Sequence, residues 1–63
     1  MPLTAREIEC LKWAVDGLTS WETSVILGIA EDTVRFLLDS ARKKLNARDK
    51  FHAAVIALRS GKM

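Results

Sequence analysis

The chain has few of the residues that build disulfides, metal centres or membrane spans. Its 63 residues include one cysteine, one histidine and no tyrosine. One cysteine cannot form an internal disulfide, and one cysteine with one histidine cannot supply the ligands of a structural zinc site. No apolar run approaches the roughly 20 residues of a membrane span, and charges from Arg6 onward interrupt any signal peptide. We therefore expect a cytoplasmic protein without a metal or other cofactor, in which Cys10 is a small core residue.

Catalytic motifs are also absent from the sequence. It contains no nucleophile–base pair and no phosphate-binding loop. His52 has no second histidine, cysteine or paired carboxylate near it in the sequence, so we expect it to be a partly exposed helix residue. The chain is therefore not expected to be an enzyme.

The chain is short, but 49% of its residues are hydrophobic, which argues against intrinsic disorder. A domain of this size buries only about 60% of its unfolded surface, and such a thin core often gains stability from a partner subunit. We expect a single domain over residues 1–63.

Capping and stop signals divide the chain into four helices without a strand. Thr4 and Glu7 have the spacing of a capping box, Asp49 can cap the last helix, and Gly28 marks a tight turn. The predicted helices cover residues 5–16, 21–27, 31–45 and 50–60. The expected fold is all-α, a four-helix bundle. Its short second helix, glycine turn and third helix match a helix-turn-helix unit in length and order.

Charge is distributed unevenly along the chain. Residues 1–32 carry two basic and six acidic side chains, a net of −4, whereas residues 33–63 carry eight basic and two acidic ones, a net of +6. A basic half is either a solvated surface or a binding surface for a polyanion such as nucleic acid.

The third predicted helix has one apolar face and one face suited to DNA. At about 100° per residue, the core stripe consists of Val34, Leu38, Ala41 and Leu45, with Leu37 at its margin. The opposite face carries Asp32, Arg35, Phe36, Asp39, Arg42 and Lys43. Arg35 lies near the helix N-terminus and can bind guanine O6 and N7, while Phe36 can pack on a thymine methyl. Thr33 can bind a phosphate beside the free backbone N–H groups of the first turn.

The rest of the basic half offers further phosphate contacts. Arg42 and Lys43 are expected to neutralise phosphates, and Lys50 and Arg48, near the beginning of the fourth predicted helix, can touch phosphate as well. Asp39 repels the phosphate backbone. It therefore either accepts a hydrogen bond from the cytosine amino group or acts against wrong sequences.

The fourth predicted helix is apolar on two sides. Ala53, Ala54 and Ala57 form one face, and the opposite face is formed by Phe51, Val55 and Leu58. A bundle this small cannot hide both faces, so one is expected to pair with a second subunit; the alternative is a fully enclosed helix. Periodicity leaves both faces open for that role, and we assign the dimer interface to Phe51, Val55 and Leu58.

Taken together, these segments resemble the LuxR-type DNA-binding domain over nearly the whole chain and in one register. The residues that carry the resemblance are 3–7, 11–14, 17, 19–22, 27–29, 33–36 and 44–45. The Thr-Ser-Trp-Glu run at residues 19–22 is most similar to the quorum-sensing branch, whose members bind acyl-homoserine lactones. The resemblance implies that the third helix enters the major groove and that the fourth pairs two subunits. It also implies that the domain forms the C-terminal module of a longer regulator.

The resemblance also bears on the second helix. It places the turn formed by Thr19, Ser20 and Trp21 at the DNA backbone. From the residues alone, Trp21 is either a lid over the core or an indole N–H donor to a phosphate. At the start of the third helix the family commonly has a serine cap, where this chain has Ala30.

In the first helix the resemblance and the periodicity differ. Periodicity allows a buried stripe of Ile8, Leu11 and Val15. The resemblance favours Cys10, Leu11 and Ala14 instead, with Ile8 directed outward, and we follow it.

Two functions are consistent with these features. The first is a sequence-specific DNA-binding domain of a bacterial transcription regulator. It would bind as a homodimer to a palindromic site with half-sites about one helical turn apart, and RNA polymerase would be a further partner. The alternative is a protein-interaction module, such as a decoy that dimerises with a full-length regulator and binds DNA weakly or not at all. Duplex binding that weakens steeply with salt favours the first function.

Overall fold

Four helices joined by short turns make up residues 2–62, the part of the chain that the computed structural model describes. They are α1 (Ala5–Val15), α2 (Ser20–Leu27), α3 (Glu31–Lys44) and α4 (Lys50–Arg59). The predicted all-α fold is confirmed, and each predicted boundary lies within one residue of the observed one. Within residues 2–62, no helix is both long enough and apolar enough to cross a membrane.

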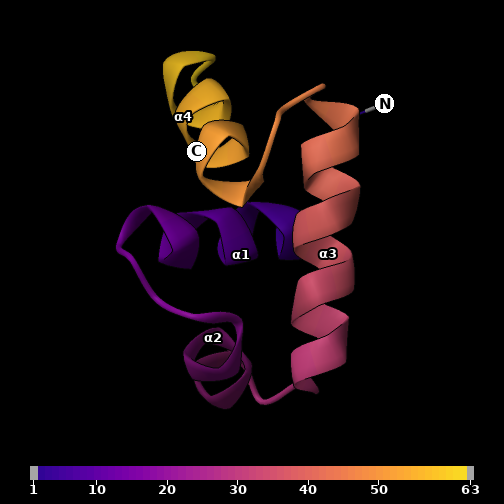
Figure 1. Cartoon of the computed structure of the whole chain (residues 1–63), viewed down its shortest axis with the longest axis vertical. Coiled ribbons are helices and arrows are strands. Elements are labelled where there is room, and N and C mark those ends of the chain that lie inside the picture. Colours follow the sequence, from indigo (N-terminus) through magenta and orange to yellow (C-terminus); the bar gives the residue numbers. More distant parts are fainter. Residues whose placement is uncertain (1, 63) are drawn as a thin grey trace.

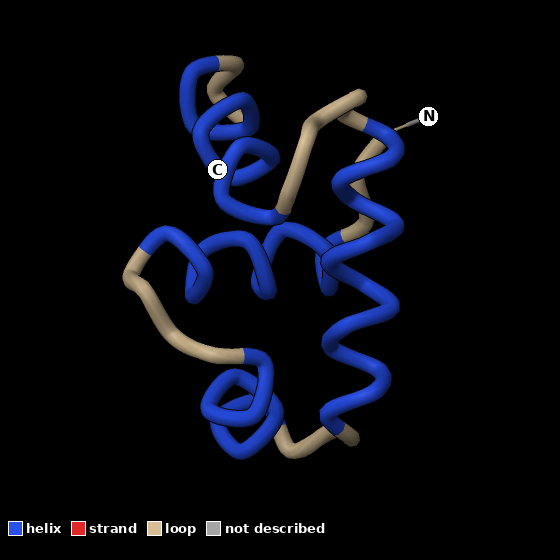
Figure 2. The backbone as a smooth tube through the Cα atoms, viewed as in Figure 1, coloured by secondary structure: helices blue, strands red, loops and turns tan. Residues whose placement is uncertain are grey.

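The helices are arranged around α1, which lies in the middle of the molecule (Figure 1). α2 and α4 lie on opposite sides of α1, and α3 runs along the edge of the molecule and packs against the other three helices. The short loops at the ends of the helices are visible in Figure 2. Because α3 is packed from one direction only, its other side is left free.

Side-chain caps fix where three of the helices begin. Thr4 and Glu7 form the expected capping box: the Glu7 N–H donates to Thr4 Oγ1 at 3.2 Å, and the Thr4 N–H donates to Glu7 Oε1 at 2.7 Å. Thr19 and Glu22 form a second box at the start of α2. Asp49 caps α4, as predicted, by accepting from the His52 N–H at 2.8 Å. These bonds satisfy backbone donors that have no partner within the helix.

The connection between α2 and α3 is a tight corner. Gly28 has a φ of 68°, a left-handed conformation that a residue with a side chain adopts only at a cost. The N–H groups of Gly28 and Ile29 both donate to the Ser24 carbonyl, which closes α2. Ala30 then precedes α3 without a side-chain cap. This corner sets the short second helix against the third, as a helix-turn-helix unit requires.

The core is built mostly from small residues. Its buried hydrophobic members are Cys10, Leu11, Ala14, Val34, Leu38, Ala41, Ala47, Ala53, Ala54 and Ala57. The stripe on α1 is therefore the one that the family resemblance favours, and Val15 is exposed. On α3 the predicted stripe is confirmed, with Leu37 and Leu45 partly buried at its edge. Alanines at helix crossings let α4 approach α1 and α3 closely.

One buried ion pair ties α1 to α3. Lys44 Nζ lies 2.8 Å from Glu7 Oε1, and the Glu7 side chain is only 3% exposed. Burial raises the pKa of the Glu7 carboxyl, but hydrogen bonds from Lys44, Ser40 and the Thr4 backbone outweigh it and lower the pKa from 4.5 to about 2. The pair holds the C-terminal end of α3 on the first turn of α1.

Candidate nucleic-acid interface

The outward face of α3 is fully available to a partner. Phe36 is 71% exposed, although it is a large apolar side chain. Thr33, Arg35, Asp39 and Lys43 are exposed on the same helix, and Arg42 is half-buried beside them. The predicted separation into a core stripe and a solvent face is therefore confirmed.

The N-terminal half of this face is centred on Arg35. Its guanidinium makes a 2.6 Å contact with Glu31 Oε2 and a 3.5 Å contact with Asp32 Oδ1. Both carboxylates belong to the first turn of α3, where negative charge also interacts favourably with the helix dipole. Arg35 is thus held along the helix surface with its side chain 63% exposed.

The C-terminal half of the face is organised by Asp39. Arg42 donates from Nε and Nη2 to Asp39 Oδ1 at 3.1 and 2.9 Å, and Lys43 Nζ lies 3.2 Å from Oδ2. These hydrogen bonds from Arg42 and Lys43 lower the pKa of the Asp39 carboxyl. Arg42 Nη1 also donates to the Ala47 carbonyl at 3.2 Å, which connects α3 to the loop before α4.

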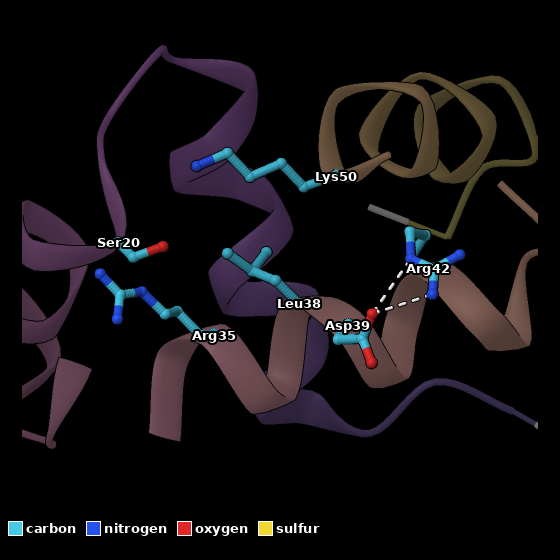
Figure 3. Close-up of a pocket in the computed structure, with 6 residues that line it drawn as sticks. All are labelled: Ser20, Arg35, Leu38, Asp39, Arg42 and Lys50. Atoms are coloured by element: carbon cyan, nitrogen blue, oxygen red, sulfur yellow. Dashed lines mark hydrogen bonds and ion pairs between the residues drawn. The ribbon is translucent and has the colours of Figure 1, made fainter. Parts of the chain in front are cut away.

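A shallow hollow brings residues of three helices together (Figure 3). It has a volume of about 250 Å³ and is lined by Ser20, Arg35, Leu38, Asp39, Arg42 and Lys50. Arg35 extends toward Ser20 at the beginning of α2, and Lys50 reaches in from the beginning of α4. Five of these six residues were predicted DNA contacts. Leu38, predicted as a core residue only, also forms part of the wall.

The beginning of α2 exposes an indole next in sequence to Ser20. Trp21 is 61% exposed, so the lid-over-the-core interpretation is wrong. Its backbone carbonyl accepts from Ser24 Oγ at 2.6 Å, which fixes the first turn of α2. The Thr19 hydroxyl accepts from the Glu22 N–H as part of the cap. The turn thus presents an aromatic N–H donor and the half-buried Ser20.

The fourth helix exposes one of its two apolar faces. Its three alanines at 53, 54 and 57 are buried, whereas Phe51, Val55 and Leu58 are each about half exposed. The enclosed-helix alternative is therefore wrong, and the packing decides which face is left free. Val15 at the end of α1 lies beside this face, on a shared apolar groove. Periodicity alone allowed Val15 in the buried stripe, whereas the stripe that the resemblance favours, and that we follow, leaves Val15 out of the core.

The fold and the surface together define a helix-turn-helix domain of the kind that transcription regulators use to bind DNA. The family described as "Bacterial regulatory proteins, luxR family" matches residues 1–57. The chain belongs to this family.

Curated relatives support the same assignment. The chain is 51% identical to the HTH-type quorum sensing-dependent transcriptional regulator RpaR of Rhodopseudomonas palustris, over 94% of this chain and 24% of RpaR. It is 46% identical to the transcriptional activator LuxR of Aliivibrio fischeri, over 94% of this chain and 24% of LuxR. Its identity to the transcriptional activator VanR of Vibrio anguillarum is 42%, over 94% of this chain and 25% of VanR. The chain spans about a quarter of the length of these relatives.

Proposed function

We propose that this chain is a sequence-specific DNA-binding domain that inserts the outward face of α3 into the major groove. Phe36 is exposed next to Arg35, on a helix whose other side forms the core, and this exposure is the main support for the proposal. An exposed phenylalanine remains hydrated and gains nothing in the free chain, whereas in the groove it can leave water and pack on a thymine methyl. Arg35, near the helix N-terminus, is placed to bind guanine.

Phosphate contacts would surround this reading surface. From Arg35 to Lys43 the rise along α3 is about 12 Å, which is similar to the width of the major groove of about 12 Å. Lys43, Lys50 and the turn with Ser20 and Trp21 would therefore meet backbone on the groove edges, and Thr33 would meet it at the α3 N-terminus.

Two copies of the domain would bind together. The apolar face of α4 formed by Phe51, Val55 and Leu58 is exposed to water in the single chain. A second copy would present the same face and bury both. The preferred site would be a palindrome with half-sites about one helical turn apart.

The family also suggests where this domain lies in a longer protein. We propose a cytoplasmic, non-enzymatic module at the C-terminus of a longer transcription regulator. RNA polymerase is a further proposed partner. The exposed apolar residues Val25 and Ile26 on α2 would be available to it.

Binding titrations with duplexes of about 20 base pairs test the proposed function. One duplex is selected by the protein from a randomised pool, and the other is unselected. Arg35→Ala should weaken binding to the selected duplex by about 1–3 kcal/mol and relax its preference. Lys50→Ala should weaken both duplexes alike and reduce the salt slope by about 0.9, since one phosphate contact is lost.

Lys12→Ala is the matched control, because Lys12 is an exposed lysine on α1 outside this surface. It should bind both duplexes like the parent. If the parent shifts no duplex at low salt, the proposed function is wrong and a protein-interaction module becomes the better account.

A further inference from the structure

The outward face of α3 carries carboxylates that compete with phosphate for its basic side chains. Three acidic side chains, at positions 31, 32 and 39, pair with three basic ones, at positions 35, 42 and 43. The formal charge of these six side chains is zero. The face of α3 that would meet DNA therefore carries no net formal charge.

Asp39 has the largest share in this neutralisation, because its two carboxylate oxygens hold different cations. Oδ1 accepts from Arg42, and Oδ2 lies 3.2 Å from Lys43 Nζ. Among residues 2–62, Asp39 is the only carboxylate within ion-pair distance of Lys43. Without Asp39, Arg42 would still donate to the Ala47 carbonyl, but within residues 2–62 the Lys43 ammonium makes no other hydrogen bond or ion pair.

Binding to an unselected duplex depends almost entirely on phosphate neutralisation. When Lys43 moves from Asp39 to a phosphate, the Asp39 carboxylate is left unpaired facing the DNA. The repulsion between this carboxylate and the phosphates cancels part of the binding free energy gained from the new contact. A cytosine at the right position removes this penalty, because its N4 amino group donates to a carboxylate. Adenine sets the N7 acceptor beside its amino group, and guanine and thymine present acceptors there, so all three fit less well.

We propose that Asp39 is a specificity-determining residue, which holds Lys43 and Arg42 back on unselected DNA and releases them where a cytosine binds its carboxylate. Asp39 lies one turn beyond Arg35 on the same face, and both line the hollow of Figure 3. A rise of about 6 Å between them corresponds to about two base-pair steps. The inference rests on the proposed function, since it concerns the same surface.

The test compares Asp39→Asn with Glu9→Gln on the unselected duplex at several salt concentrations. Both substitutions remove one negative charge, and both carboxylates pair with an arginine three residues away, but Glu9 lies on α1 with Arg6. Asp39→Asn should bind about two- to five-fold more tightly than the parent, as expected for release of an exposed ion pair. Its salt slope should steepen by up to about 0.9. Glu9→Gln should remain near the parent.

Two further measurements identify Lys43 as the released group and cytosine as the base. Lys43→Gln should reduce affinity more in the Asp39→Asn background than in the parent, because Lys43 is free only there. Selection from a randomised duplex pool should enrich cytosine at one half-site position with the parent and lose that enrichment with Asp39→Asn.

The binding results can disprove the role of Asp39 without disproving DNA binding. If the parent binds duplex DNA with a clear salt dependence but Asp39→Asn behaves like Glu9→Gln, the role of Asp39 is wrong and the proposed function stands. Selection of the same bases by parent and Asp39→Asn would also overturn the inference. If the parent binds no duplex, both proposals are wrong.

Discussion

Glu7 shows how much a single side chain contributes to the position of α3. It caps α1 through the Thr4 N–H and pairs with Lys44 at 2.8 Å, in a setting where its own side chain is 3% exposed. A carboxylate buried in this way stabilises the fold only while it is charged, because protonation removes the attraction to the lysine.

The pH dependence of stability should report on this residue. The pKa of Glu7 is lowered from 4.5 to about 2, so its contribution is complete above about pH 4.5 and is lost as the pH falls toward 2. Glu7→Gln keeps a residue suited to the capping box but should lower the free energy of unfolding at pH 7 by about 3 kcal/mol. Urea denaturation should show the difference between parent and variant disappearing between pH 4.5 and pH 2.

Glu22→Gln is the matched control for this experiment. Glu22 closes the same kind of capping box on α2, but among the described residues it has no ion-pair partner. Its replacement should leave the free energy of unfolding at pH 7 close to that of the parent. An equal loss in both variants would mean that the cap, and not the pair with Lys44, carries the effect.

The exposure of Phe36 could be predicted from the sequence, whereas the exposure of Trp21 could not. The exposure of Phe36 follows from its position opposite the α3 stripe, since a helix has a fixed angle per residue. Trp21 lies on a short helix that is apolar on several sides, so the angle alone cannot decide between core and surface. The pair of Glu7 and Lys44 joins residues 37 positions apart, and no local pattern signals it.

At the scale of the elements, the beginning of α3 is a weak point. Ala30 has φ −67° and ψ 147°, the extended geometry of an N-cap residue, but it has no side chain to accept a hydrogen bond. Ala30→Ser should place a hydroxyl within reach of the Thr33 N–H and raise the free energy of unfolding by about 1 kcal/mol. Thermal denaturation of the variant would detect this gain.

The opposite change at α2 provides the comparison. Thr19→Ala removes the hydroxyl that accepts from the Glu22 N–H at 3.1 Å and should lower stability by about 1 kcal/mol. If Ala30→Ser gives no gain while Thr19→Ala gives the loss, the first turn of α3 is held by something other than its cap.

The boundaries of all four helices could be predicted because their signals are local. Capping residues, Gly28 and the left-handed Asn46 lie next to the ends they determine. The buried stripe of α1 required the family resemblance, because periodicity also allowed Ile8, Leu11 and Val15. The free face of α4 required the structure, since both faces are apolar and only packing against α1 and α3 buries the alanines.

At the scale of the whole molecule, the proposed dimer would form through the apolar groove beside α4. Phe51, Val55 and Leu58 join Val15 and two buried alanines along this groove. Val55→Glu should place a charge in the centre of the pairing surface and weaken self-association about tenfold or more, as measured by sedimentation equilibrium. The fold should survive, because Val55 is exposed in the single chain.

Val25→Glu is the control for the dimer experiment. Val25 is also an exposed valine on a helix surface, but it lies on α2 away from α4. It should leave self-association unchanged. Equal association of both variants and the parent would contradict pairing through α4.

DNA is proposed to bind the outward face of α3. Amide NMR shifts recorded while a salt-matched duplex is added test this proposal most directly, because every backbone N–H along the chain reports its own surroundings. The shifts should be concentrated in residues 19–22 and 31–43, with small changes along the exposed side of α1 that carries Lys12. Shifts concentrated on α1 or on the apolar face of α4, with residues 31–43 unchanged, would contradict the proposal.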